Sequence, residues 1–305
     1  MSTEASHDFR RGFAATFASF LIWGLLPLYL KQLHDTGALE IMAHRVAWAC
    51  LFVFAYLALR GELGKVTTVL RDVATLRRLA ASAVLISANW LLYVWAVTAG
   101  HVVEASLGYF INPLVSVLLG VFVLRERLHR AQWLSVAIAA LGVLWLTVQV
   151  GQPPWIALGL AASFGCYGLI RKLVFVESVV GLGVETVLIA PVMLAYLLWT
   201  AHAGTMSFLA HDRLLDALLI ASGAFTAIPL VLFAYGVRRV PLSTVGIMQY
   251  VGPTLQLLTG VFVFREAFTH VQLVGFGLIW FALVVYAGDG LWRSRRTRAP
   301  LAESA

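Results

Sequence analysis

Long apolar runs follow one another along almost the whole chain, and short polar connectors separate them. Ten of these runs are close to the length of about 20 residues that a helix needs to cross the hydrocarbon core of a bilayer. They fall at residues 12–32, 38–58, 78–98, 102–124, 132–150, 154–174, 182–200, 214–236, 241–264 and 270–290. The pattern therefore predicts an all-α polytopic membrane protein with ten transmembrane helices.

The composition leads to the same class of protein. Charged residues make up 12% of the 305 residues and hydrophobic residues 61%, whereas a typical soluble protein has about 25% charged residues. No stretch between the apolar runs is long enough to form a soluble catalytic domain. The first run has no small-residue cleavage site, so we interpret it as a span and not as a signal peptide. Cys50 and Cys166 lie far apart inside apolar runs and are expected to be small buried residues.

The distribution of basic residues predicts the orientation in the membrane. On alternate sides of the predicted spans, 18 of the 22 Lys and Arg residues fall on one side and 3 on the other, while Arg45 lies inside a span. Because Lys and Arg are enriched on the cytoplasmic side, the tails 1–11 and 291–305 are both predicted to be cytoplasmic. Topology also accounts for the net charge of +7, so no nucleic-acid partner is expected.

The chain repeats itself at an offset of about 140 residues. A shift of 140 places Leu107–Glu126 on Ile247–Glu266, and a shift of 144 places Ala18–Leu25 on Ala162–Leu169. The first pair of segments matches in its proline, in a Gly-Val-Phe-Val stretch and in a final Arg-Glu. Such matches carry more information than matched leucines and valines, so we predict a duplication.

The two predicted repeats span residues 12–150 and 154–290. Each repeat holds five spans, an odd number, so the second must enter the membrane in the opposite orientation to the first. Glu40 and Glu185 then occupy equivalent places in the second helix of each repeat. Two inverted five-helix repeats are typical of secondary transporters, in which related bundles expose one site to either face in turn.

Specific motifs add a resemblance to this architecture. A five-plus-five arrangement with a Pro-containing helix that ends in Gly-x-x-x-x-Arg-Glu in each half resembles the EamA family of the drug/metabolite transporter superfamily. Within that family, four segments are similar to the RarD branch, whose name refers to chloramphenicol sensitivity. They are His44–Trp48, Asn89–Val97, Glu104–Leu114 and Gln249–Leu255.

The resemblance covers nearly the whole chain and implies a permease of the inner membrane. Its substrate would be an amino acid, another small metabolite or a drug-like solute, and the resemblance does not identify which. The partners implied are therefore a small-molecule substrate and the lipid bilayer. The sequence leaves open whether the protein forms a homodimer, in which direction it transports, and which ion drives it.

The second span carries the densest group of polar residues. Glu40, His44 and Trp48 share one helical face, with Arg45 beside them. Arg45 lies roughly 10 Å from the outer end of its span, too deep to reach the surface easily. One hypothesis is that Arg45 binds an anionic group while Glu40 or His44 carries a proton. The other is a structural ion pair of Arg45 with Glu40 or Glu104, and both remain open.

The fourth and ninth spans each contain a proline among polar residues. Pro113 and Pro253 remove a backbone donor, so we expect a helix break at each, with the two breaks facing each other near the midplane. In the third span, Asn89 and Tyr93 share one face and are expected to form part of the same wall. The expected substrate contacts are Arg45, Asn89, Tyr93, Tyr109, Asn112, Gln249 and Tyr250, and the expected coupling groups are Glu40, His44 and Glu104. Simple helix packing is the alternative.

Other polar or aromatic residues are assigned structural roles at this stage. Trp23 and Tyr167, equivalent in the repeats, are expected to serve helix packing. Glu185 is expected to be an interfacial carboxylate, with a second proton site as the alternative. Arg125 and Glu126, like the matching Arg-Glu pair of the second repeat, are expected to form a solvated ion pair and not a gate.

The sequence has no phosphate-binding Gly-x-x-x-x-Gly-Lys-Ser/Thr motif, so neither ATP nor another cofactor is expected. Its histidines show no metal-ligand spacing, so no metal site is expected either. A proton gradient is the natural energy source, because one charge moved through 100 mV gains about 2.3 kcal/mol. An intramembrane enzyme would need a nucleophile with a base, which we do not find. A passive channel, recognisable by transport that does not saturate, is the remaining alternative to a secondary transporter working by alternating access.

Overall fold

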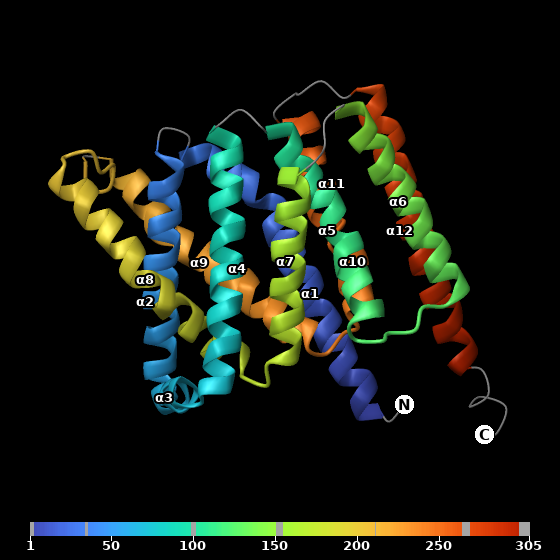
Figure 1. Ribbon diagram of the computed structural model, residues 1–305, viewed down its shortest axis with the longest axis horizontal. Coiled ribbons are helices and arrows are strands. Elements are labelled where there is room, and N and C mark those ends of the chain that lie inside the picture. The colour runs from blue at the N-terminus through green and yellow to red at the C-terminus, as the bar shows by residue number, and fades with distance from the viewer. Residues whose placement is uncertain are drawn as a thin grey trace.

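The computed structural model describes residues 3–33, 36–98, 102–150, 155–210, 212–263 and 269–298, which are helical apart from short connections (Figure 1). The helices of the first half are α1 (Thr3–Leu30), the short η1 (Lys31–Leu33), α2 (Ala38–Leu59), α3 (Leu63–Arg71), α4 (Val73–Thr98), α5 (Val102–Phe122) and α6 (Arg130–Val150). Those of the second half are α7 (Trp155–Leu173), α8 (Ser178–His202), α9 (Arg213–Val237), α10 (Leu242–Met248), α11 (Val251–Leu258), the π-helical η2 (Thr259–Val263) and α12 (His270–Arg298).

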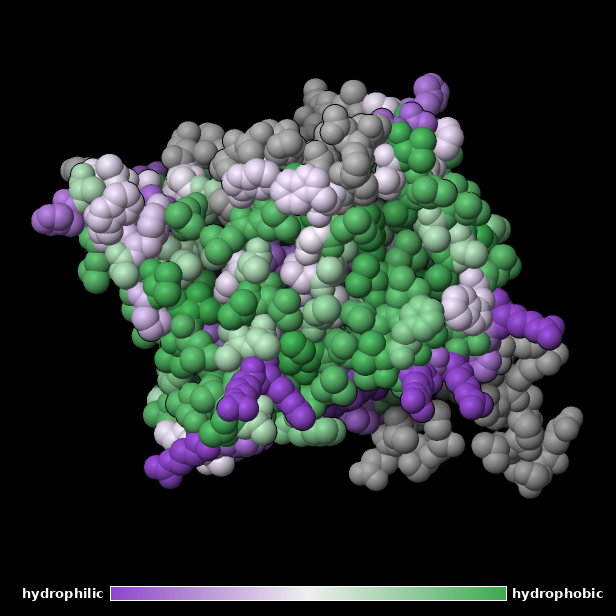
Figure 2. Space-filling view, viewed as in Figure 1, coloured by the Kyte–Doolittle hydropathy of each residue, from purple (hydrophilic) through white to green (hydrophobic). Residues whose placement is uncertain are grey.

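Seven of the described helices are long and apolar enough to cross a membrane, namely α1, α2, α6, α7, α8, α9 and α12. The other three predicted spans correspond to α4, to α5 and to the interrupted pair of α10 and α11. Figure 2 shows a broad hydrophobic band across the middle of the molecule, with hydrophilic side chains gathered mainly along its lower edge. The protein is therefore a multi-pass membrane protein whose outer apolar side chains face lipid.

The amphipathic helix α3 was not predicted from the sequence. It buries Val66, while Lys65 lies 3.1 Å from a carboxylate oxygen of Glu62 and 3.0 Å from one of Glu177. The next helix begins at residue 73, five residues before the predicted span. Asp72 explains this start, because its carboxylate accepts hydrogen bonds from the backbone N–H of Ala74 and from the Thr75 hydroxyl. The Thr75 hydrogen bond also lowers the pKa of Asp72.

The predicted helix break at Pro113 is wrong, because α5 runs without interruption from Val102 to Phe122. The ninth span is interrupted: Gln249 and Tyr250 form a turn between α10 and α11. Here the carbonyl of Gln249, which Pro253 leaves without its helical donor, accepts a 3.2 Å hydrogen bond from Gly252 N–H. The residue before the proline is glycine at 252 but asparagine at 112. Because glycine tolerates irregular backbone better than asparagine, this difference favours an interruption in the second half only.

The two halves pack against each other with exchanged partners. The second, fourth and fifth helices of the halves pair with their own equivalents, as α2 with α8, α5 with α10, and α6 with α12. The first helix of each half packs against the third helix of the other, as α1 with α9 and α7 with α4. Figure 1 shows α6 and α12 side by side at one end of the molecule, and the start of α1 at the same edge as the end of α12. This pairing is what a pseudo-twofold axis between the halves produces.

Glycines bring helices of the two halves into backbone contact. A Cβ added to Gly246 in α10 would lie 2.6 Å from the carbonyl oxygen of Pro113 in α5. A Cβ on Gly223 in α9 would lie 2.6 Å from the backbone nitrogen of Ala49 in α2. Because a main chain cannot move aside as a side chain can, these crossings depend on the absence of a Cβ.

We predict that Gly246→Ala lowers the thermal stability of the purified protein by an amount typical of overpacking, about 1–3 kcal/mol. The added methyl group must push α5 and α10 apart. Gly277→Ala in α12 is the matched control, because nothing lies within 4 Å of its added Cβ. Melting curves in detergent measure both variants, and equal melting temperatures for the two would contradict the prediction.

Candidate substrate-binding site

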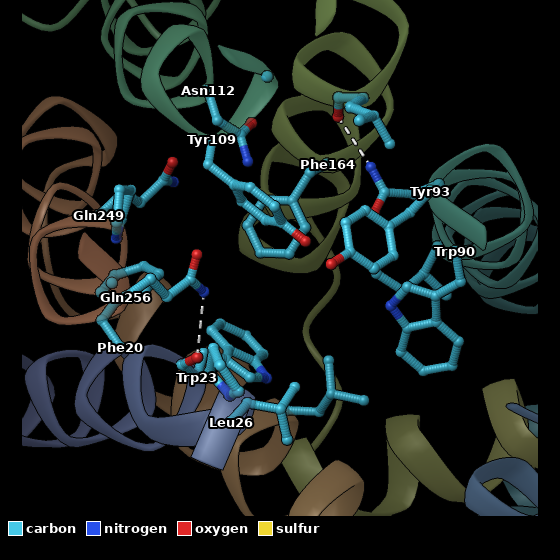
Figure 3. A pocket seen from close by; sticks show the side chains of 18 of the residues that line it. Phe20, Trp23, Leu26, Trp90, Tyr93, Tyr109, Asn112, Phe164, Gln249 and Gln256 are labelled. Carbon is cyan, nitrogen blue, oxygen red and sulfur yellow. Dashed lines mark hydrogen bonds between the residues drawn. The ribbon is translucent and has the colours of Figure 1, made fainter. Parts of the chain in front are cut away.

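A cavity of about 160 Å³ lies between the two halves of the bundle (Figure 3). Six of the seven expected substrate contacts line it. These are Arg45 from α2, Asn89 and Tyr93 from α4, Tyr109 and Asn112 from α5, and Gln249 from the turn between α10 and α11. Gln256 from α11 is a further polar group in the wall, and both Gly252 and Pro253 also line the cavity. The proline-containing segments of both halves thus meet at one site.

Among the described residues that line the cavity, Arg45 is the only charged one. Its Nε donates a 2.9 Å hydrogen bond to Oγ1 of Thr226, and its guanidinium carbon lies 5.1 Å from the centre of the Trp90 ring. The described part of the structure contains no carboxylate at ion-pair distance from it. Arg45 therefore gives the cavity a positive charge. The cation–π contact with Trp90 stabilises the guanidinium but does not neutralise it.

Amide side chains form the polar part of the wall. Asn89 donates hydrogen bonds of 2.8 Å to the carbonyl of Leu160 and 2.9 Å to the hydroxyl of Ser163, so its orientation is fixed. Gln249 donates to Ser116 Oγ at 2.8 Å, but its carbonyl oxygen has no partner among the described residues. The carbonyl oxygen of Asn112 is likewise buried without a partner. Two buried acceptors next to the cavity therefore lack a hydrogen-bond partner among the described residues.

Aromatic rings supply the remaining wall and one end of the cavity. Tyr93 and Tyr109 meet edge to face with ring centres 5.8 Å apart, and their hydroxyl groups point toward each other in Figure 3. Phe20, Trp23 and Phe164 also line the cavity. Behind them is the buried Phe233, whose ring centre lies between 5.4 and 6.0 Å from those of all three. This aromatic cluster closes the end of the cavity nearer to the start of α1.

Tyr250 is the one expected substrate contact that the structure does not bring to the cavity. Its side chain is buried among Ile111, Ala139 and Ile279, in a separate hydrophobic cluster between α5, α6 and α12. It occupies the same place in the repeat as Phe110, which packs against the same cluster. The turn at 249–250 directs neighbouring side chains to different sides, so only Gln249 reaches the site.

Two of the expected coupling groups lie away from the cavity. Glu40 accepts hydrogen bonds from Ser207 N–H at 2.7 Å, Ser207 Oγ at 3.1 Å and Phe208 N–H at 3.3 Å, so it anchors the connection between α8 and α9. His44 packs on the ring of Phe208, and its Nε2 lies 4.0 Å from Glu40. The third candidate, Glu104, belongs to α5, but its side chain lies outside the described part of the structure. The alternative of an ion pair between Arg45 and Glu40 is wrong, because Arg45 contacts Thr226 and Trp90 while Glu40 contacts Ser207 and Phe208.

Two further expectations are wrong. Glu185 is not interfacial, because its side chain is buried between α4, α7 and α8, where it contacts Ser82 and Arg171. Glu126 does not form a solvated pair with its neighbour Arg125. Its carboxylate instead accepts hydrogen bonds of 2.7 and 2.9 Å from the first two N–H groups of α10. The matching Arg-Glu pair of the second half lies outside the described residues.

The sequence interpretation missed the aromatic residues Phe20 and Phe164, and it assigned Trp23 to helix packing alone. Trp23 in fact both packs and lines the cavity. The internal repeat contained the missing information, because the shift of 144 residues pairs Phe20 with Phe164. These two residues lie at mid-span on the first helix of each half. They face the axis between the halves, where the cavity forms.

Comparisons with known proteins identify the family of this bundle. The EamA-like transporter family profile matches the chain twice, over residues 10–148 and 154–288. A protein named RarD from Streptomyces exfoliatus is 45% identical over 303 residues, which cover 99% of this chain and 96% of that protein. An uncharacterized transporter of Pseudomonas aeruginosa is 44% identical over 96% of this chain and 98% of its own length.

A crystal structure shares the fold, with a TM-score of 0.69 over 90% of this chain and 96% of that one. Because the two sequences are only 20% identical, this similarity concerns the fold alone. The relatives named above match over nearly their full lengths, and the matched family is one of transporters and not of enzymes. The chain therefore belongs to the EamA-like transporter family and is a homologue of RarD.

Proposed function

We propose that this protein is a secondary transporter that carries a small organic solute across the inner membrane by alternating access, with both termini in the cytoplasm and ten membrane crossings. The observation that carries this proposal is the cavity between the two halves, in whose described wall Arg45 is the single charged residue. Inverted-repeat transporters bind their substrates between the repeats near the middle of the membrane. The two family matches, one in each half, support the same arrangement.

The lining of the cavity favours a solute with an anionic group and a flat apolar part. Arg45 offers a guanidinium that can form paired hydrogen bonds with a carboxylate. Tyr93, Tyr109 and Phe164 offer ring surfaces against which an aromatic body can pack. The free carbonyl oxygens of Asn112 and Gln249 suit a hydrogen-bond donor, such as an amide or an ammonium group. Candidates of this kind include aromatic carboxylates, amino acids and amphipathic drugs.

The contacts below the cavity support a state that is closed on the cytoplasmic side. The aromatic cluster around Phe233 seals the end of the cavity nearer to the cytoplasmic start of α1. Farther down, Glu126 binds the first N–H groups of α10. Lys172 donates hydrogen bonds to the carbonyls of Val237 at 3.1 Å and Val240 at 2.6 Å, which ties α7 to the end of α9. At the other end, the cavity extends to Leu30 at the end of α1.

We predict that benzoate, phenylalanine or chloramphenicol raises the melting temperature of the purified protein, because a ligand that binds only the folded state stabilises it by mass action. Arg45→Ala should weaken the apparent affinity for an anionic ligand at least about tenfold, since a hydrogen bond to a charged group contributes about 1.5–3 kcal/mol. Arg60→Ala, an exposed arginine that follows the same helix, is the matched control. Equal ligand shifts in the two variants would move the site away from Arg45.

We also predict that solute flux in proteoliposomes saturates with concentration and that unlabelled solute on the far side accelerates the entry of labelled solute. A carrier returns faster when it is loaded, whereas a channel shows neither property. Radiolabelled benzoate or phenylalanine, whichever stabilises the protein, measures both properties. Flux that rises linearly with solute concentration and does not change with unlabelled solute on the far side would favour the passive channel.

A further inference from the structure

A buried ion pair lies on the cytoplasmic side of the cavity and has no part in the substrate contacts proposed above. Arg171 of α7 and Glu185 of α8 are each 2% exposed, and Nη1 of Arg171 lies 3.5 Å from Oε1 of Glu185. Nη2 donates a 3.3 Å hydrogen bond to the carbonyl of Ser178, while Nε has no partner among the described residues. Gly181 leaves the room for this guanidinium, because a Cβ there would overlap it. The pair is therefore buried but incompletely hydrogen-bonded.

The hydroxyl of Ser82 makes the Glu185 site compatible with two protonation states. Ser82 has one hydroxyl hydrogen but contacts two acceptors, the carbonyl of Leu79 at 2.9 Å and Oε1 of Glu185. If Ser82 donates to Glu185, the contact is compatible with an ionised carboxylate. If Ser82 donates to Leu79, the contact is a hydrogen bond only when Glu185 carries a proton and donates it to Ser82. A proton can thus bind or leave without rearrangement of the heavy atoms.

Glu40, the residue equivalent to Glu185 in the first repeat, lacks this property. It accepts three hydrogen bonds, two of them from backbone N–H groups that can only donate. Those two N–H groups cannot accept a hydrogen bond, so they cannot reverse their direction as the Ser82 hydroxyl can. Glu126 is held in the same manner by two N–H groups. Among these three carboxylates, Glu185 alone accepts no hydrogen bond from a backbone N–H of the described residues, and its uncharged partner is the Ser82 hydroxyl.

A second, small and apolar cavity lies between Glu185 and the substrate cavity. Its volume is about 10 Å³, close to the smallest that holds one water molecule. Glu185 and Thr226 both line it, and it shares Ile86, Trp90 and Leu230 with the larger cavity. Thr226 is also the residue whose Oγ1 accepts the hydrogen bond of Arg45. Thr226 therefore contacts Arg45 on one side and lines the same small cavity as Glu185 on the other.

We infer that Glu185 is the proton-binding group that couples transport to the proton gradient, in place of Glu40, His44 and Glu104. This inference rests on the proposed function. A proton from one side of the membrane adds to the carboxylate, which becomes a neutral carboxylic acid, and it leaves to the other side once the site has opened to that side. Protonation leaves the charge of Arg171 uncompensated and makes the region around Arg45 more positive. An anionic solute at Arg45 and a proton on Glu185 therefore favour each other's binding, by the same factor in both directions.

The charged and titratable groups around Glu185 are few. They come from the helices that pack against α8 and from the segments next to them. They are Tyr167 and Arg171 of α7, Cys50 of α2 beside Thr186, Arg238 after α9, which faces Arg171, and the Lys65–Glu177 pair where α3 meets the start of α8. None of these is a second acid in contact with Glu185, so a proton that enters this site binds to Glu185.

Modification with dicyclohexylcarbodiimide tests proton binding without a substrate, because this reagent reacts with protonated carboxyl groups in apolar surroundings. In the wild-type protein we expect peptide mapping to find the adduct on Glu185, with a yield that rises as the pH falls. Glu185→Gln should lose this adduct and Glu40→Gln, the matched control, should keep it. An unmodified Glu185 at every pH would mean a permanently ionised structural pair and would overturn the inference.

Ligand binding tests the coupling itself. The carboxylate of benzoate stays ionised from mildly acidic to alkaline pH, and its affinity for the wild-type protein should rise as the pH falls, by about 5–150-fold, the usual range for two coupled sites. In Glu185→Gln the affinity should stay high at every pH, and in Glu40→Gln it should follow the wild type. An unchanged pH dependence in Glu185→Gln would overturn the inference while leaving the proposed function intact.

If Glu185→Gln fails to fold because Arg171 is left unpaired, the double variant Arg171→Gln/Glu185→Gln removes both charges and takes its place in the same assays. Loss of pH dependence in the double variant, with ligand binding retained, supports the inference. A wild-type pH dependence in it overturns the inference. If the wild-type protein binds none of benzoate, phenylalanine and chloramphenicol, that result counts against the proposed function. The carbodiimide result still decides whether Glu185 binds a proton.

Discussion

The whole structure depends on close helix packing, because lipid offers neither a hydrophobic driving force between helices nor hydrogen bonds for the backbone. Helices of opposite halves approach each other where glycine permits it, as Gly246 does against Pro113 and Gly223 against Ala49. These contacts fix the pairing of α5 with α10 and of α2 with α9. Where larger side chains such as Trp23 stand between the halves, the helices cannot close completely. The central cavity is the space that remains.

The same scarcity of hydrogen-bond partners separates structural polar groups from functional ones. Most buried polar groups of the described bundle are fully paired within the protein, and Glu40 is an example with three donors. Arg45, Asn112 and Gln249 keep unused hydrogen-bonding capacity or charge, and all three line one cavity. Glu185 has a partner that serves either protonation state. The free-energy cost of burying these groups is therefore concentrated around the proposed substrate site, where a bound solute would offset part of it.

The sequence was sufficient to predict the architecture and most of the candidate site, for identifiable reasons. Apolar run lengths defined the spans, and polar residues at mid-span had to face other protein groups, so Arg45 and Asn112 were placed correctly beside the cavity. The sequence could not predict the direction of the Tyr250 side chain, which depends on a local turn, or the continuity of α5 through Pro113. The burial of Glu185 was also missed, because its distance from the helix end does not reveal that α4 and α7 cover it.

The interruption at Gln249 and Tyr250 has no counterpart in α5, and this difference breaks the symmetry between the halves. A bend in the second half can be absorbed by one turn, whereas the equivalent bend in the first half must deform a continuous helix. Equivalent movements of the two halves therefore carry different free-energy costs. In the proposed transport cycle, the two end states would then be unequally populated even without a gradient, and the resting protein would favour one face of the membrane.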